Sequence, residues 1–146
     1  MKHLTLFAAL SLCGNAQAAT YVYQANAYSG HQGRCGGSLL PFQVTITARK
    51  ALPPNTTRKD APLKTVAVNA GGKYQWGYTA TKKHELGGLF VTDSNGDITE
   101  WNFSAATNGH RWFNTHNQPG SVEDMINFRC GGAAVENNPG TWTRTK

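Results

Sequence analysis

Apolar and polar residues alternate in several short stretches of the chain. The alternation is clearest at residues 42–47, where the apolar residues Phe42, Val44 and Ile46 alternate with the polar residues Gln43, Thr45 and Thr47. A period of two is typical of a β-strand with one buried face, because successive side chains point to opposite faces. We therefore predict a strand at residues 42–47 with one face in the core and the other in water.

The strongest hairpin signal lies in residues 89–104. Two β-prone runs, 89–92 and 97–104, flank Asn95 and Gly96. An Asn-Gly pair between such runs favours a tight hairpin, because both residues tolerate a positive φ. We expect the rest of the fold to be organised around this hairpin.

Other short β-prone runs follow one another closely, with Gly, Asn and Pro between them and no long helical period. They are residues 21–25, 63–68, 74–79, 111–113 and 140–144. Residues 26–38, 51–62 and 114–120 are predicted loops, and residues 121–124 fit one helical turn capped by Ser121. The pattern predicts an all-β domain of about eight or nine short strands, arranged as an antiparallel β-sandwich or jelly roll.

An aromatic ladder occupies alternate positions of one predicted strand: Tyr74, Trp76 and Tyr78. On an outward face the ladder would be a stacking platform for sugar rings or bases. On an inward face it is core, and the polar residues between its members favour this second interpretation. Both remain open at the level of sequence.

The first eighteen residues have the pattern of an export signal. A short basic start precedes an apolar run at residues 4–12, and Ala16-Gln17-Ala18 fits a cleavage site. We predict a signal peptide over residues 1–18, a single domain over 19–146, and a secreted or periplasmic location. Lipoprotein processing at Cys13 is the alternative, although Leu12 stands where such signals carry a small residue. No later stretch is apolar enough to cross a membrane.

Two cysteines, Cys35 and Cys130, remain after cleavage. In an exported chain such a pair is most simply one disulfide. The bridge would close a loop of about 95 residues, and chain entropy then predicts a stabilisation of roughly 4–5 kcal/mol.

The chain is basic, with 14 Lys and Arg against 8 Asp and Glu, and loss of Lys2 with the signal lowers the net charge of +6 by one. A positive surface favours anionic partners such as nucleic acid, anionic polysaccharide or lipid head groups. The basic residues are scattered in pairs, however, so solvated loop charges are the competing explanation.

One segment occurs twice, as Arg34-Cys35-Gly36-Gly37 and as Arg129-Cys130-Gly131-Gly132. If the cysteines pair, the glycines lie beside the bridge and allow the backbones to approach closely. The same pairing would bring Arg34 and Arg129 together as an anion site.

Metal and cofactor signals are weak, and we predict neither a metal site nor a cofactor. Asp93, Asn95 and Asp97 alternate as in a calcium loop. The glycine and glutamate that such a loop needs at its sixth and twelfth positions are replaced by Ile98 and Ser104.

Four histidines would remain in the mature chain: His31, His84, His110 and His116. Two of them, with a lysine, could perform acid–base catalysis on RNA, so His110 and His116 are candidate ligand-binding or catalytic residues. Each histidine sits among loop-type neighbours, and nothing in the sequence brings them together.

Four segments together carry a resemblance to known proteins. They are residues 21–28, residues 42–47 with the Leu-Pro-Pro-Asn that ends at residue 55, residues 90–101, and the Asn-Pro-Gly-Thr-Trp at 138–142. In this order they resemble a loose group of uncharacterised secreted bacterial β-rich proteins, many of which end in a PEP-CTERM sorting anchor. The anchor is absent after the Gly-Thr-Trp segment, and the two Arg-Cys-Gly-Gly segments are additional. The resemblance implies export from a bacterial cell and an all-β fold, with no catalytic residues to transfer.

These observations favour a binding or envelope-associated module over an enzyme. The expected ligands are anionic polymers or glycans of the envelope or matrix, and the candidate contact residues are Arg34, Arg129, Tyr74, Trp76, Tyr78, His110 and His116. A small secreted hydrolase, nuclease-like and dependent on histidines, is the first alternative. An inhibitor or toxin-like factor is the second.

Overall fold

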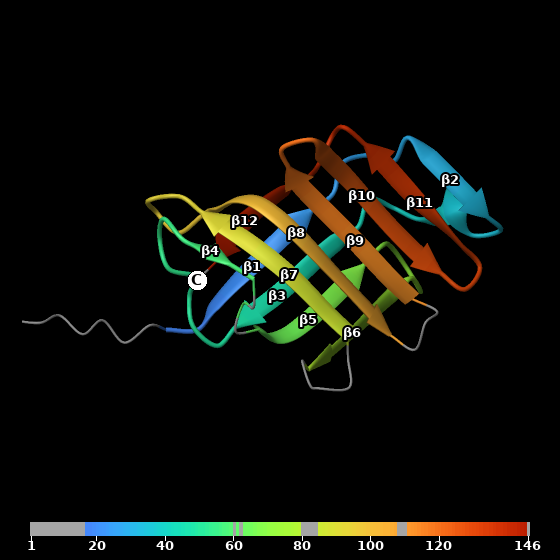
Figure 1. Cartoon of the computed structure of the whole chain (residues 1–146). Coiled ribbons are helices and arrows are strands. Elements are labelled where there is room, and N and C mark those ends of the chain that lie inside the picture. Colours follow the sequence, from blue (N-terminus) through green and yellow to red (C-terminus); the bar gives the residue numbers. More distant parts are fainter. Residues whose placement is uncertain (1–16, 60, 62, 80–84, 108–110, 146) are drawn as a thin grey trace, which may run out of the picture.

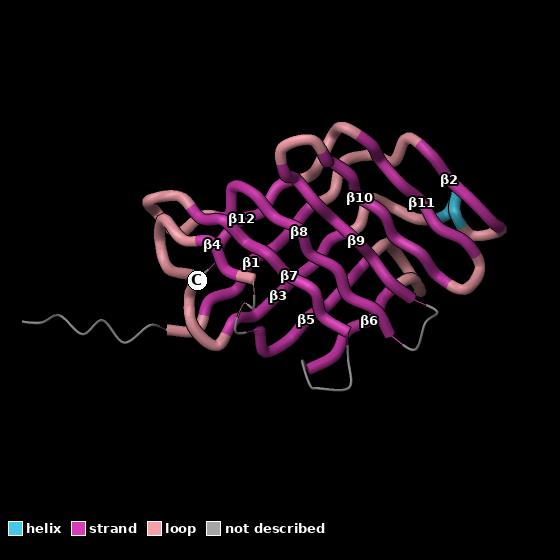
Figure 2. Tube along the Cα trace, viewed as in Figure 1, coloured by secondary structure: helices cyan, strands magenta, loops and turns pink. Residues whose placement is uncertain are grey.

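Two antiparallel β-sheets pack face to face in the computed structural model, which describes residues 17–59, 61, 63–79, 85–107 and 111–145 (Figure 1). Strands and their short connections make up most of the trace (Figure 2). This arrangement confirms the predicted all-β sandwich with one disulfide. The described residues form twelve strands, more than the eight or nine predicted. Nearly all of the predicted signal peptide lies outside the described residues.

The first sheet has the strand order β12-β1-β3-β5-β6. Its strands are β1 (Ala19–Gln24), β3 (Gln43–Ala48), β5 (Leu63–Asn69), β6 (Gln75–Thr79) and β12 (Thr141–Thr145). The second sheet has the order β2-β11-β10-β9-β8-β7-β4 and lies in front of the first in Figure 1. Its strands are β2 (Gly30–Gly33), β4 (Thr57–Arg58), β7 (Glu85–Thr92), β8 (Ile98–Thr107), β9 (Arg111–Gln118), β10 (Ser121–Phe128) and β11 (Gly131–Glu136).

The core fills the space between the sheets with side chains from alternate strand positions. On β3, Val44 and Ile46 are fully buried while Gln43 is exposed, which confirms the predicted alternation. The largest fully buried side chains are aromatic: Tyr21, Tyr23, Phe42, Phe90, Phe103 and Phe113. Because each such side chain contributes about 1.5–3 kcal/mol on burial, these rings account for much of the stability of the domain.

The predicted hairpin is formed by β7 and β8, and its turn differs in detail from the expectation. The amide of Gly96 donates to the carbonyl of Asp93 (3.1 Å), and the amide of Asp93 donates to the carbonyl of Asp97 (3.0 Å). Gly96 has a φ of 81°, whereas Asn95 keeps a negative φ. The connection is therefore a longer loop with one left-handed residue, and not a two-residue turn with two.

Residues 114–124 were predicted to be a loop followed by a helical turn, and this prediction is wrong. Residues 114–118 belong to β9 and residues 121–124 to β10, where Thr115 lies opposite Asp124, and only residues 119–120 between them form a turn. Asn114, Asn117 and Asp124 are of types that are depleted in strands. Their strand conformation depends on the cross-strand pairing and on the buried contacts described below.

Two shorter strands lie in segments predicted to be loops. Strand β2 pairs with β11 at one edge of the second sheet, and the two-residue β4 pairs with β7 at the other. Gly- and Pro-rich sequences give no strand signal, and neighbouring edges supply the hydrogen bonds that make these residues extended.

The disulfide Cys35–Cys130 joins the segment after β2 to the β10–β11 turn, with the two Cα atoms 5.5 Å apart. The glycines beside Cys130 allow close backbone approach, as predicted. A Cβ on Gly131 would collide with the carbonyl oxygen of Gln32, and one on Gly132 would lie 2.5 Å from that of Ile126. Gly37 has open space around it, so a side chain at this position of the first segment would meet no obstacle.

Replacement of both cysteines by alanine should lower the free energy of unfolding by about 4–5 kcal/mol, because the unfolded chain regains the entropy of a long loop. Urea unfolding of the oxidised wild type and the double variant measures the difference. Reductant serves as the control: it should destabilise the wild type and leave the variant unchanged. An equal midpoint for both oxidised proteins would contradict this prediction.

Gly140 lies where β11 leads into β12, against the backbone of β1. A Cβ at this position would collide with the carbonyl oxygen of Gln24. Gly140→Ala should therefore destabilise the protein by about 1–3 kcal/mol or more. Gly30→Ala is the matched control, because a Cβ at Gly30 would meet nothing within 4 Å. Thermal unfolding of the two variants compares them, and equal midpoints would rule out the steric constraint.

Candidate functional site

A carboxylate is fully buried between the two sheets. Asp124 of β10 accepts hydrogen bonds from the hydroxyls of Tyr23 and Thr115, each at 2.6 Å. Trp101 donates its indole N–H to Thr115 at 2.8 Å, and the amide of Gly140 donates to the Tyr23 hydroxyl at 2.7 Å. The cluster therefore connects β1 of one sheet to three strands of the other.

Burial raises the pKa of Asp124, while the hydrogen bonds from Thr115 and Tyr23 act in the opposite direction. Burial also raises the pKa of the Tyr23 phenol, and the neighbouring carboxylate adds to that shift. Asp124 and Thr115 are closed to solvent, so no ligand in solution can reach them. The cluster therefore stabilises the packing of the two sheets.

The described histidines are separated from one another. His31 lies on β2, and its ring is nearly perpendicular to that of Tyr28. His116 lies on β9, paired across strands with Glu123 of β10. Their side chains approach to 3.8 Å between Nε2 and a carboxylate oxygen, beyond hydrogen-bond distance. His84 and His110 lie outside the described residues.

A basic cleft of about 540 Å³ opens at the end of the sandwich that holds the disulfide. Four cationic side chains line it: Arg34, Lys73, Arg111 and Arg129. They come from the segment after β2, the β5–β6 turn, the start of β9 and the β10–β11 turn. The structure thus brings Arg34 and Arg129 into one cleft, as the repeated segment suggested. Lys73 and Arg111 were missed, because their partners in the cleft are distant in sequence.

Two aromatic rings form part of the wall of the basic cleft. Tyr74, the last residue before β6, meets Phe128 of the second sheet edge to face, with ring centroids 5.2 Å apart. The ammonium of Lys73 lies 5.5 Å from the centroid of the Tyr74 ring. Phe128 is buried and Tyr74 half-buried, so the tyrosine is the ring that a ligand could contact.

No carboxylate lines the basic cleft among the described residues. Among the described residues an ion pair joins His116 to Glu123, and none of the four cations of the cleft takes part in it. Cations that are not neutralised by protein carboxylates attract anions, and guanidinium groups bind carboxylate, sulfate or phosphate in a forked geometry. The cleft is therefore suited to an anionic group.

The remaining members of the aromatic ladder are part of the core. Trp76 is only 9% exposed and lies between Tyr78 and Phe113, with ring centroids at 5.8 and 6.0 Å. The inward-facing interpretation is confirmed for Trp76. This side chain cannot act as an outward stacking platform, and Tyr74 is the member that lines the basic cleft.

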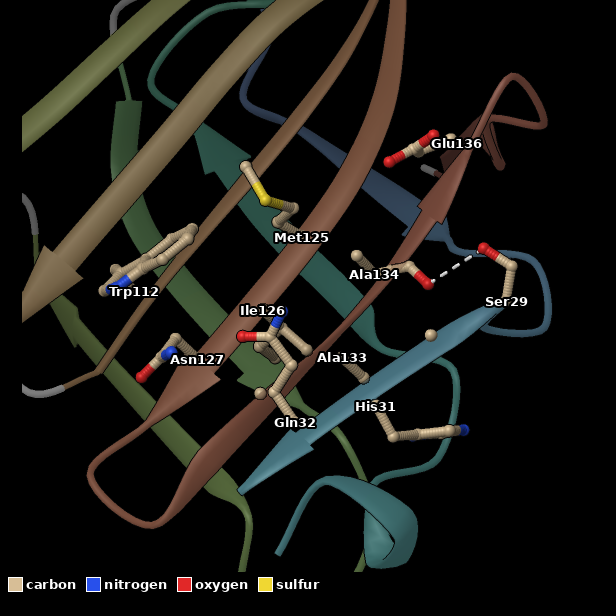
Figure 3. A pocket seen from close by; sticks show the side chains of 12 residues that line it. Ser29, His31, Gln32, Trp112, Met125, Ile126, Asn127, Ala133, Ala134 and Glu136 are labelled. Atoms are coloured by element: carbon tan, nitrogen blue, oxygen red, sulfur yellow. Dashed lines mark hydrogen bonds between the residues drawn. The ribbon is translucent and has the colours of Figure 1, made fainter.

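A second hollow, of about 290 Å³, lies on the outer face of the second sheet (Figure 3). It spans β9, β10, β11 and β2, and its lining includes Trp112, Met125, Asn127 and Gln32. These side chains stand on one face of the sheet in Figure 3. The sequence singled out none of these four residues, because residues 111–113 give only a short β-prone run and no signal for which face each side chain occupies.

No group of three or more His, Cys, Asp or Glu side chains that could hold a metal occurs among the described residues. The Asp93 carboxylate is engaged in its own turn, where it accepts the amides of Asn95 (2.8 Å) and Asp97 (3.0 Å). These backbone hydrogen bonds hold the pKa of Asp93 below its usual range. Within the described ranges, no helix has the length and apolar character that a membrane span requires.

Comparison of the chain with models of protein families, with curated protein sequences and with solved structures found no match. Functional inference for this chain therefore depends on the geometry and chemistry of its own surface.

The buried position of Asp124 predicts a specific pH dependence. A raised pKa in the folded state means that the contribution of Asp124 to stability is complete below the usual aspartate pKa of about 3.9 and is lost as the pH rises through the raised value. The free energy of unfolding of the wild type minus that of Asp124→Asn should thus fall with rising pH, by at most about 1.4 kcal/mol per pH unit. Urea unfolding between pH 3 and pH 8 measures this difference.

Asp93→Asn provides the matched control with the opposite sign. Because the pKa of Asp93 is lowered, the contribution of Asp93 to stability is lost as the pH falls. The free energy of unfolding of the wild type minus that of Asp93→Asn should therefore rise with pH. A flat or rising curve for Asp124→Asn would contradict the raised pKa.

Proposed function

We propose that this protein is an exported binding module whose basic cleft holds an anionic ligand of the cell envelope or extracellular matrix. The observation that carries the proposal is the composition of the cleft: four cationic side chains, one accessible aromatic ring and no lining carboxylate among the described residues. Such a lining can offer several charge-assisted hydrogen bonds to one anionic group.

The rigidity of the basic cleft supports a binding role. Arg34 and Arg129 each precede a cysteine of the disulfide, so the bridge holds their backbones at a fixed separation. Arg111 begins a strand that pairs with β8 and β10. Cationic groups on a fixed backbone lose less entropy when an anion binds, which increases affinity.

Export is supported by three features: the signal pattern of residues 1–18, the disulfide, and the resemblance to secreted bacterial proteins. A disulfide persists in an oxidising compartment such as the periplasm or the exterior. We therefore place the protein outside the cytoplasm of a bacterial cell.

The hydrolase alternative receives less support from the described residues. It needs a histidine and an acid–base partner within hydrogen-bond reach in one cleft. The pair recorded there, His116 and Glu123, is 3.8 Å apart, and neither residue lines the basic cleft.

Arg129→Glu should weaken the binding of anions by at least about tenfold, because it removes one charge-assisted hydrogen bond and adds repulsion. Calorimetric titration of the oxidised protein with tripolyphosphate and with polygalacturonate measures the affinity. Binding by the wild type should weaken as salt is added, since ions screen exposed charges.

Arg58→Glu is the matched control. Arg58 is also exposed and lies on β4, at the opposite edge of the same sheet. The substitution changes the net charge by the same amount, and the variant should bind like the wild type. Equal affinity of the wild type, Arg129→Glu and Arg58→Glu would show that the basic cleft is not the anion site.

A further inference from the structure

The hollow on the outer face of the second sheet and the basic cleft are lined by neighbouring residues of the same strands. Trp112 of the hollow directly follows Arg111 of the cleft, and Asn127 precedes Arg129 by two residues. Two residues along an extended chain span about 7 Å. A ligand of a few rings could therefore contact both hollow and cleft.

The lining of the hollow has the chemistry of a site for a sugar ring. Trp112 is partly exposed and lines the hollow. Asn127 lies opposite Trp112 in the strand pairing, and Gln32 lies two strands further on. The apolar C–H face of a pyranose can pack on the indole of Trp112. The side-chain amides of Asn127 and Gln32, which form no hydrogen bond with other described residues, can bond the hydroxyl groups of the sugar.

Charge varies along the hollow and gives the site a direction. Arg111 and Arg129 lie beyond the end formed by Trp112 and Asn127. Glu136 lines the hollow at the other end of β11, four residues beyond Gly132, which is the partner of Asn127. A carboxylate there can accept hydroxyl groups and repels anionic ones. An acidic sugar would therefore place its charge toward the arginines.

We propose that the hollow and the basic cleft together form one site for an acidic polysaccharide, with a sugar ring on Trp112 and its acidic groups at Arg111 and Arg129. This inference rests on the proposed function for its anionic part and adds the ligand class and the outer-face subsite. It assigns Asn127 and Gln32 to the hydroxyl groups of the ring.

Three soluble probes separate the ring contribution from the charge contribution in calorimetric titrations of the oxidised full domain. Oligogalacturonate has rings and carboxylates, its methyl ester has rings without charge, and tripolyphosphate has charge without rings. Trp112→Ala should weaken oligogalacturonate binding roughly tenfold, the scale of one lost stacking contact, and leave tripolyphosphate binding unchanged. Trp112→Phe, which keeps a ring, should recover part of the affinity.

Asn127→Ala has a matched control in Asn102→Ala. Both asparagines point to the outer face of the second sheet, but Asn102 is exposed on β8 and does not line the hollow. Only Asn127→Ala should weaken oligogalacturonate binding, by about threefold to tenfold for one hydrogen bond. Melting temperatures of all variants confirm that each is folded.

The outcomes distinguish the two proposals. If Arg129→Glu weakens both anionic probes while Trp112→Ala and Asn127→Ala change neither, the anion site stands and the sugar subsite is overturned. If Arg129→Glu changes nothing, the proposed function fails. If single-stranded DNA binds more tightly than oligogalacturonate and loses affinity in Trp112→Ala, the ligand is a nucleic acid and the assignment to an acidic polysaccharide is overturned.

Discussion

The buried carboxylate of Asp124 is the constraint around which the sandwich is assembled. Its hydrogen bond from Tyr23 is a buried polar link between the two sheets, and its bond from Thr115 links the central strands β9 and β10. A buried carboxyl group without partners would cost several kcal/mol, so the surrounding side chains must be in place before this position is tolerated. The aromatic rings of Trp101 and Trp142 pack on Tyr23 and keep water from the cluster.

The cluster and the disulfide place different restrictions on the molecule. The cluster lies inside the sandwich and fixes the two sheets relative to each other. The disulfide lies at the end of the sandwich and holds β2 and the β10–β11 turn together. This division leaves the outer face of the second sheet free to vary in chemistry, because neither stabilising feature depends on side chains exposed on that face.

The proposed binding surface is formed where sheet edges and turns meet. The basic cleft takes side chains from both sheets, and Tyr74 and Phe128 meet across the gap between them. Binding sites commonly occupy such positions, since loops at the end of a sandwich can converge without disturbing the core. The adjoining hollow adds a half-exposed indole and side-chain amides to this cationic end.

The sequence by itself determined the fold class, the disulfide and the strands whose residues alternate. Residues 42–47 and the 89–104 hairpin were predictable because their strand periodicity and turn residues are local properties. The pairing of Cys35 with Cys130 followed from their number. Periodicity also placed Trp76 on the inward face, with its polar neighbours exposed.

Only the tertiary structure determined that the polar segment forms strands and that the residues of the candidate site lie together. The polar residues of β9 and β10 form strands because Asp124 accepts hydrogen bonds from Thr115 and, between the sheets, from Tyr23. These residues are distant in sequence or on separate strands, so no local pattern predicts the contacts. The basic cleft brings together four cationic residues that are far apart in the chain: Arg34, Lys73, Arg111 and Arg129. Local pattern fixes which residues are extended and which are buried, whereas the convergence of distant charges depends on how the sheets are paired and packed.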